Sequence, residues 1–393
     1  MVDSALSPTA ITASILIGAA ELEQRDGAVV PHRLPRWVRE QNRDDAQLLM
    51  AQSHCAGVRL RVRTRATVLQ LETRRTTTVL RGLPPRPAGV FDLRIDGALV
   101  EQRTASGGTT VVVDMTTGER EVQQTPTSII AFTGLPGGAK DLELWLPWNE
   151  AVELVELRSD APLEAIPTDG RPVWLHHGSS ISHGSNAASS TGTWPVIAAD
   201  LGGVELINLG LGGSALVDPF LARTIRDTPA DLISLKLGIN LVGTDLFRLR
   251  ALGPAVHGFL DTIRDGHPET PLLVISALHC AIHEQTPGPG SFDVQAAQQG
   301  QVRFIATGDP AEVPAGRLTL EVIREQLRLI VEQRSATDEH LHFLDGLQLY
   351  GAQDERDHPL PDALHPDAAS HALIGERFAR AAFGPSGCFA AHP

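Results

Sequence analysis

The chain has few cysteines, no long apolar run and no basic leader. Its three cysteines, Cys55, Cys280 and Cys388, are odd in number and widely spaced. They predict no disulfide framework and suit a reducing compartment. No apolar stretch approaches the roughly 20 residues that cross a membrane. The apolar segment 10–20 has no Lys or Arg before it, which a secretory signal would have. These absences together predict a cytoplasmic protein.

Positive charge is also scarce. The 33 Lys and Arg residues face 47 Asp and Glu residues, which leaves a formal net charge of −14. Nucleic acids and anionic membranes attract basic surfaces, so we expect neither as a partner. At 393 residues the chain is long enough for two domains, each with a sizeable core.

The first part of the sequence is rich in short β-prone segments. Turn residues such as Pro84-Pro85 and Asp96-Gly97 separate most of them. This spacing predicts an antiparallel, jelly-roll-like β-sandwich over residues 1–165. The expected strands are 57–63, 67–73, 76–80, 90–95, 109–114, 128–133 and 141–146.

Tryptophans in this half allow two interpretations. They could stack on a sugar ring, as in a carbohydrate-binding module, but such residues more often complete a core or a domain interface. The residues concerned are Trp37, Trp145 and Trp148.

Beyond residue 171 the pattern changes to helical windows that alternate with apolar strands. This predicts a three-layer α/β/α domain with a parallel sheet over residues 171–385. The boundary between the two parts is expected near 160–170, at Ala161-Pro162 and at 167–170. The stretches 284–300 and 307–317 are expected to be long loops, the first of them over the functional site.

One serine stands where a strand should give way to a helix. Ser180 lies in Gly-Ser-Ser-Ile-Ser at 178–182, after the β-prone run 171–177 and before the helical pattern at 194–202. A serine in this place is exposed on rigid elements, with backbone N–H groups around it. An isolated Gly-Ser-Ser is more often a plain turn, so the interpretation depends on the blocks that follow.

Two further blocks follow two further strands. Gly213 comes after the apolar run 204–209, and Asn240 comes after the run 231–239. Glycine lets its backbone N–H approach a ligand closely, and an asparagine amide can donate to a developing oxyanion. Each is more ordinary as a turn residue. Together with the Ser180 N–H they predict a three-donor oxyanion hole.

The fourth block is Asp-Ala-Leu-His at 362–365. The three-residue offset can bring the Asp362 carboxylate to Nδ1 of His365, which leaves Nε2 available as a base. Taken alone, such an aspartate is more often the cap of the helical stretch 367–378. With Ser180, the pair completes the set that serine acyl transfer requires.

These blocks resemble the GDSL, or SGNH, hydrolase superfamily over roughly residues 171–383. Two positions depart from the family pattern. Ser179 stands where the family usually has Asp before the nucleophile, and Leu241 replaces a common Asp. Neither is a triad position, so the departures bear on substrate class. The resemblance implies a nucleophile, two oxyanion donors and an acid–histidine pair at Ser180, Gly213, Asn240, Asp362 and His365.

The resemblance implies an esterase or acylhydrolase that attacks a small-molecule ester or thioester through an acyl-serine. The two-domain layout, with His-His-Gly-Ser-Ser-Ile-Ser-His at 176–183, is also similar to superfamily acyltransferases that move an aryl acyl group from coenzyme A to a polyketide hydroxyl. A natural-product or sugar hydroxyl is then the acceptor. The triad does not distinguish an esterase from an acyltransferase, because water and an alcohol attack the acyl-serine by the same route. A decayed carbohydrate-binding protein is disfavoured, since all five positions are filled.

One competing cluster suggests a metal. His279, Cys280 and His283 form His-Cys-x-x-His, but only Glu284 offers a carboxylate nearby. We therefore expect no metal and no cofactor, apart from a coenzyme A thioester as a possible acyl donor. The histidines are expected to line a pocket, to bind substrate or to form a satisfied polar cluster.

Overall fold

The computed structural model describes residues 6–114, 117–167 and 170–390. The chain divides into two compact units, Met1–Gly170 with Ser189–Thr191, and Arg171–Ala188 with Gly192–Pro393. Of the expected boundary motif at 167–170, Thr168 and Asp169 lie outside the described residues. The prediction of an α/β chain with a parallel sheet is confirmed.

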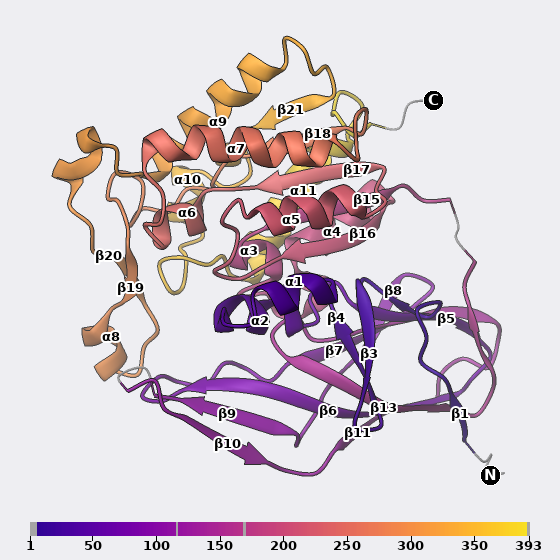
Figure 1. The fold of residues 1–393 in the computed structure, drawn as a ribbon. Coiled ribbons are helices and arrows are strands. Elements are labelled where there is room, and N and C mark those ends of the chain that lie inside the picture. Colours follow the sequence, from indigo (N-terminus) through magenta and orange to yellow (C-terminus); the bar gives the residue numbers. More distant parts are fainter. Residues whose placement is uncertain (1–5, 115–116, 168–169, 391–393) are drawn as a thin grey trace. The chain divides into compact units, whose positions relative to one another are not determined.

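The first unit consists mainly of strands (Figure 1). These are β1 (Ser7–Thr9), β2 (Leu16–Ile17), β3 (Glu21–Arg25), β4 (Ala28–His32), β5 (Arg59–Thr64), β6 (Val68–Leu80), β7 (Val90–Ile95), β8 (Ala98–Thr104), β9 (Thr109–Val113), β10 (Arg120–Gln124), β11 (Ser128–Thr133), β12 (Lys140–Trp145), β13 (Ala151–Ser159) and β14 (Leu163–Ala165). Two short helices, α1 (Arg36–Gln41) and α2 (Ala46–Ser53), interrupt them.

These strands form two sheets. One has the order β10-β9-β6-β13-β4-β3, with β1 beside β13 and β11 beside β6. The other has the order β14-β5-β12-β7-β8, with β2 beside β5. Neighbouring strands run antiparallel, with the exception of the parallel pair β6–β9.

A single apolar core draws on both sheets. Leu71 and Leu154 enter it from the larger sheet, and Leu60, Phe91 and Leu144 from the smaller one. Buried Leu142 and Leu144 alternate with a polar residue along β12, as the sequence pattern indicates. Of the three tryptophans, Trp145 and Trp148 are buried, and the Arg59 guanidinium lies 4.5 Å from the centre of the Trp145 ring.

The expected strand break near residue 75 is wrong. The segments 67–73 and 76–80 form one strand, β6, because its central arginines find partners across the sheet. Arg74 pairs with Glu153 and Arg75 pairs with Glu150, each at 2.7 Å. Opposite charges on neighbouring strands allow a polar stretch to continue the ladder. Both helices and the strands β1 to β4, β8, β10, β13 and β14 lie outside the predicted strand segments.

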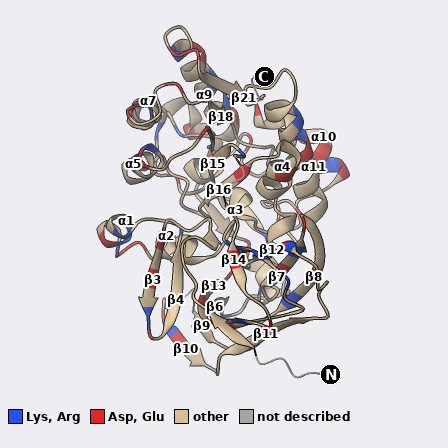
Figure 2. Ribbon diagram, turned by 90° about the vertical axis from the view of Figure 1, so that its right-hand side faces the viewer, with Lys and Arg blue, Asp and Glu red and all other residues tan. Residues whose placement is uncertain are grey.

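The second unit contains a five-stranded parallel sheet of order β16-β15-β17-β18-β21. Helices cover both of its faces, with α5 and α7 on one side and α4 and α11 on the other (Figure 2). The sheet strands are β15 (Val173–Gly178), β16 (Glu205–Gly210), β17 (Leu232–Lys236), β18 (Leu272–Ile275) and β21 (Leu341–Leu344). The helices are α3 (Ser180–His183), α4 (Trp194–Gly202), α5 (Pro219–Asp227), α6 (Ile239–Gly243), α7 (Leu249–Arg264), α8 (Val294–Gln298), α9 (Leu320–Arg334), α10 (Ala352–Asp357) and α11 (Ala368–Phe378).

Three of the predicted blocks follow strand ends on one edge of this sheet. Gly178 at the end of β15 pairs with Gly210 at the end of β16, and β17 ends at Lys236. Since parallel strands end at a common edge, the loops that follow them are brought together. After β15 the chain adds β16 on one side of it and then β17 on its other side. Ser180 follows β15 and therefore lies where the strand order reverses, the position at which α/β sheets bind ligands.

The expected loop at 284–300 is only partly a loop. It contains β19 (Gly290–Phe292), which pairs with β20 (Phe304–Ala306), and the connection holds α8. Phe292 and Phe304 are cross-strand partners with ring centres 4.7 Å apart, a contact that stabilises so short a hairpin. The second expected loop contains a 3-10 turn at Pro310–Ala315.

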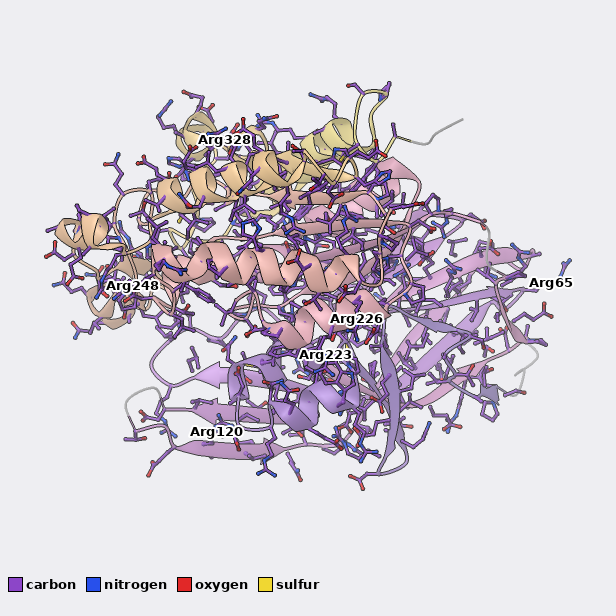
Figure 3. All side chains as sticks on the ribbon, turned by 45° about the horizontal axis from the view of Figure 1, so that its top comes forward. Arg65, Arg120, Arg223, Arg226, Arg248 and Arg328 are labelled. Carbon is purple, nitrogen blue, oxygen red and sulfur yellow. The ribbon has the colours of Figure 1, made fainter. Side chains whose placement is uncertain are left out.

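Charged side chains are spread over the surface. Arg65, Arg120 and Arg248, labelled in Figure 3, are exposed. On α9, Arg328 pairs with Glu325 and Glu332 at 2.8 and 2.7 Å, exposed contacts that solvent screens. In the part of the chain that the structure describes, no helix is both long and apolar enough to cross a membrane.

Candidate active site

Ser180 begins a single helical turn directly after β15. The N–H groups of Ser182 and His183 donate to Ser179 O at 3.0 and 2.9 Å, and Gly184, at φ 122°, ends the turn. Ser180 itself is half-buried. The turn therefore presents the Ser180 hydroxyl from a rigid frame.

His365 meets Ser180 although 185 residues separate them. Its Nε2 lies 2.9 Å from Ser180 Oγ, and its Nδ1 lies 2.8 Å from Oδ2 of Asp362. Because the carboxylate can only accept, Nδ1 carries the proton and Nε2 accepts from the serine hydroxyl. This hydrogen-bonded chain can take a proton from Ser180 as it attacks a carbonyl.

Asp362 is buried and held by several donors. Its Oδ1 accepts from the N–H groups of His365 and Leu364 at 2.7 and 3.0 Å, and Asn186 Nδ2 donates to Oδ2 at 3.3 Å. Burial by itself would raise the pKa of this carboxyl. The hydrogen bond and charge of the His365 ring, together with the two backbone donors, outweigh burial and lower the pKa. The helix cap in this region is Asp367, which accepts from Ser370 N at 2.8 Å.

The glycine-rich loop lies beside Ser180. A methyl group added at Gly212 would stand 3.6 Å from Ser180 Cβ. Among residues 211–215, all of them described, four backbone N–H groups donate within the described chain, at Leu211, Gly212, Ser214 and Ala215. Gly213, at φ 72°, is the one whose N–H makes no such bond, so it is available to an oxyanion.

Asn240 lies in the first turn of α6. Its Oδ1 accepts from Ala215 N at 3.2 Å. Because the backbone N–H is a donor, the amide atom that faces it is the oxygen, Oδ1. The amide nitrogen Nδ2, with its two hydrogens, therefore points away from Ala215. The contact links Asn240 to the loop that contains Gly213. The five predicted positions thus lie on segments that contact one another.

A buried polar cluster contacts the helical turn that Ser180 begins. The ring of His176 contacts Ser182 Oγ at 2.8 Å and Ser234 Oγ at 2.7 Å, and Trp174 Nε1 also donates to Ser234 Oγ. Burial holds the pKa of His176 well below its ordinary value and lowers the pKa of His177 to about 4. Both nitrogens of the His176 ring are hydrogen-bonded, as expected of a satisfied polar cluster. His177 is satisfied on one side only, because Nδ1 donates to Leu209 O at 2.8 Å while the buried Nε2 has no hydrogen-bond partner among the described residues.

Two contacts of the acid–histidine pair were missed in the sequence. Phe304 places its ring edge-on to the His365 imidazole, with centres 5.5 Å apart, and its N–H donates to Asp362 O at 2.9 Å. Asn186 adopts a left-handed φ of 67° beside the same carboxylate. Sequence spacing identifies neither Phe304 nor Asn186, because both are far in the chain from one or both residues that they contact.

The three side chains of the His-Cys-x-x-His motif each contact a different partner. His279 pairs with Glu355, Nδ1 of His283 donates to Thr286 O at 3.1 Å, and the Cys280 thiol lies 3.5 Å from Ala363 O. Within the described ranges, no group of three or more His, Cys, Asp or Glu side chains is arranged to hold a metal ion. The absence of a metal requirement stays a prediction.

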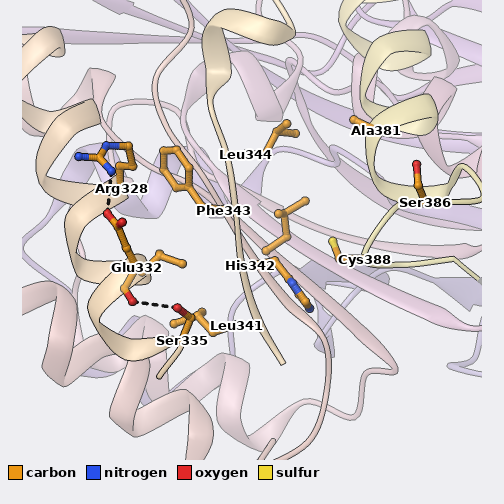
Figure 4. Close-up of a pocket in the computed structure, with 12 residues that line it drawn as sticks. Arg328, Glu332, Ser335, Leu341, His342, Phe343, Leu344, Ala381, Ser386 and Cys388 are labelled. Atoms are coloured by element: carbon orange, nitrogen blue, oxygen red, sulfur yellow. Dashed lines mark hydrogen bonds and ion pairs between the residues drawn. The ribbon is translucent and has the colours of Figure 1, made fainter. Parts of the chain in front are cut away.

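Two cavities lie along the edge strand β21. The one in Figure 4 measures about 460 Å³ and is bordered by β21, α9 and the C-terminal segment. The other measures about 550 Å³ and includes His279 and Glu284. Neither cavity is lined by Ser180 or His365.

Comparison with known proteins gives consistent matches. The GDSL-like Lipase/Acylhydrolase family matches residues 171–287. The chain is similar to the solved structure of a salicylyl-acyltransferase, SsfX3, from a tetracycline biosynthetic pathway, with 27% identity, 95% of each chain covered and a TM-score of 0.76. A GDSL-like lipase from Bacteroides ovatus shares 19% identity over 95% of each chain, with a TM-score of 0.64.

More distant similarity extends to carbohydrate esterases. A family two carbohydrate esterase from Clostridium thermocellum, solved in complex with cellohexaose, has 14% identity, 83% of this chain and 91% of that chain covered, and a TM-score of 0.56. At such identities this match and the Bacteroides match show the fold alone. The search of curated proteins found no match.

Proposed function

We propose that this enzyme of the hydrolase or acyltransferase type transfers acyl groups through Ser180, a proposal that the match of residues 171–287 to the GDSL-like lipase/acylhydrolase family supports. The substrate class is a small-molecule ester or thioester. The observation that carries the proposal is the hydrogen-bonded chain from Ser180 Oγ through His365 to Asp362, at 2.9 and 2.8 Å.

In the proposed mechanism, His365 Nε2 takes the hydroxyl proton as Ser180 Oγ attacks the carbonyl carbon. The carbonyl oxygen becomes an oxyanion, which the N–H groups of Ser180 and Gly213 and the Asn240 amide stabilise, each by roughly 3 kcal/mol. Asp362 stabilises the imidazolium. His365 then protonates the leaving alcohol or thiol, and an acyl-Ser180 remains. A second nucleophile, water or an alcohol, reverses these steps and releases the acid or a new ester.

The second candidate is transfer to an alcohol, and the hairpin favours it. Phe304 packs on the imidazole, and the β19 side of the hairpin approaches α6, because a methyl group at Gly290 would lie 3.7 Å from Gly243 O. The hairpin therefore reaches both the base and the helix of Asn240. Its paired phenylalanines supply the apolar wall that limits water at an acyl-enzyme. A coenzyme A thioester is then the donor, and a natural-product or sugar hydroxyl the acceptor.

The first unit is proposed as a jelly-roll-like β-sandwich accessory domain. Its two sheets contribute to one core, which supports face-to-face packing. No substrate role is assigned to it.

A partition measurement tests the two candidates. Acetyl- and benzoyl-coenzyme A and the matching 4-nitrophenyl esters serve as donors, with a panel of polyphenols and sugars as acceptors. The transferase candidate predicts that acylated alcohol exceeds free acid at millimolar acceptor. Free acid as the sole product with every acceptor would exclude it and leave an esterase. No protein-dependent acyl release from any donor would contradict the proposed function itself.

We expect Asn240→Ala to lower kcat about a hundredfold with little change in KM, because the amide donates mainly in the transition state. Asn240→Asp is the matched variant. It keeps the acceptor for Ala215 N but loses the donor, so its kcat should fall at least as far. Steady-state kinetics on the preferred donor measure both. A change confined to KM would show that Asn240 only binds substrate.

A further inference from the structure

We propose that His183 is a positioning residue, whose ring holds the glycine-rich loop so that the Gly213 N–H faces the oxyanion. The proposal rests on the proposed function, because it concerns the oxyanion hole. His183 ends the turn that Ser180 begins, and it is buried. Its Nδ1 accepts from Gly212 N at 3.2 Å, one residue before the donor.

The loop needs such a restraint. Glycine has the widest backbone freedom of any residue, and Gly210, Gly212 and Gly213 leave little side chain to hold the segment. The peptide between Gly212 and Gly213 contains the donor N–H. Two side chains hold the loop on either side of this peptide, His183 at Gly212 and Asn240 at Ala215. The two side chains act as anchors around the donor.

Ser214 N donates to Leu211 O at 3.0 Å, which closes a turn around this peptide but ties the loop only to itself. Other ties join the loop to the turn of Ser180 and end before the peptide. Asn208 donates from Nδ2 to Ser182 O at 3.0 Å and accepts from Gly210 N at 2.7 Å. Gly210 packs so closely that a methyl group there would stand 2.4 Å from His183 N. These contacts fix where the loop begins. The His183–Gly212 hydrogen bond extends the restraint to the residue that precedes the donor.

The chemistry of the bond identifies the group that matters. Because Gly212 supplies the hydrogen, Nδ1 of His183 must be unprotonated, and the proton of the neutral ring is on Nε2. An asparagine at this position places its Oδ1 close to where Nδ1 stands and can accept the same N–H. A glutamine keeps the bulk and polarity but carries its acceptor one bond further out.

The test compares three variants of the full-length chain, His183→Asn, His183→Gln and His183→Ala, with 4-nitrophenyl acetate as the probe. A misplaced donor loses part of its transition-state stabilisation without changing ground-state binding, so Gln and Ala should lower kcat about ten- to a hundredfold at KM within about twofold. His183→Asn should recover kcat to within about threefold of wild type, because it keeps the acceptor.

A matched control is His267→Gln in the same unit. Buried His267 contacts the carbonyls of Ile225 and Thr228, so this variant should lower the melting temperature and leave kcat unchanged. If His183→Ala does not fold, the comparison of kcat between His183→Asn and His183→Gln tests the proposal. Equal kcat in those two, or a loss seen only in KM, would overturn the proposal. Equal probe hydrolysis by wild type and Ser180→Ala would instead mark failure of the proposed function.

Discussion

Replacing Ser180 with alanine is expected to abolish turnover. Loss of a serine nucleophile in such an arrangement costs about 10⁴- to 10⁶-fold in kcat, because the remaining donors only stabilise attack by water. The fold should tolerate the change, since Ser180 is half-buried and its Oγ bonds to His365 alone among the described residues. Wild type incubated with an acyl thioester should gain the mass of one acyl group, and the variant should gain none.

A serine-directed fluorophosphonate gives an independent measurement. Peptide mapping should locate the label on Ser180 only. Ser179→Ala is the matched control, because Ser179 is buried directly before the nucleophile and its hydroxyl caps no helix N–H. It should label and turn over at rates close to those of wild type. Labelling at Ser179 or Ser182, or full activity in Ser180→Ala, would contradict the assignment of the nucleophile.

Asp362→Asn is expected to lower kcat about 10³- to 10⁴-fold, the second largest effect. Asparagine has one acceptor oxygen where the carboxylate has two, and the carboxylate accepts from the ring and the N–H of His365, from Leu364 N–H and from Asn186. Its NH₂ group would face the ring nitrogen and favour the wrong tautomer. Because the pKa of Asp362 is lowered, the native carboxylate stays ionised below its ordinary titration range.

Steady-state kinetics, measured together with thermal melts, distinguish a loss of catalysis from a loss of stability. Asp367→Asn is the control from the same segment. Asp367 caps α11, so this variant can cost at most about 1 kcal/mol of stability while kcat stays within about twofold of wild type. A kcat for Asp362→Asn within tenfold of wild type would show that the carboxylate does not orient the base.

Much of the second unit follows from the sequence alone. The expected strands at 171–177, 204–209 and 231–239 correspond to β15, β16 and β17, although β17 already ends at Lys236 and Ile239 begins α6. The expected helices correspond to α4 and α11. Local chemistry suffices there, because buried parallel strands are continuous apolar runs and glycine, proline or asparagine marks their ends. The four blocks were identified for the same reason, since each follows a strand end or precedes a helix.

Only the tertiary structure decided which side chains meet. The sequence places Ser180 and His365 far apart, and the 2.9 Å contact depends on the loop that Asp362 holds. The packing of Phe304 on His365 depends on a hairpin that was expected to be a loop. The bond from Gly212 to His183 depends on how closely two strand-end loops approach. Such contacts join residues that are distant in the chain, and their energies depend on geometry that local propensity and spacing do not encode.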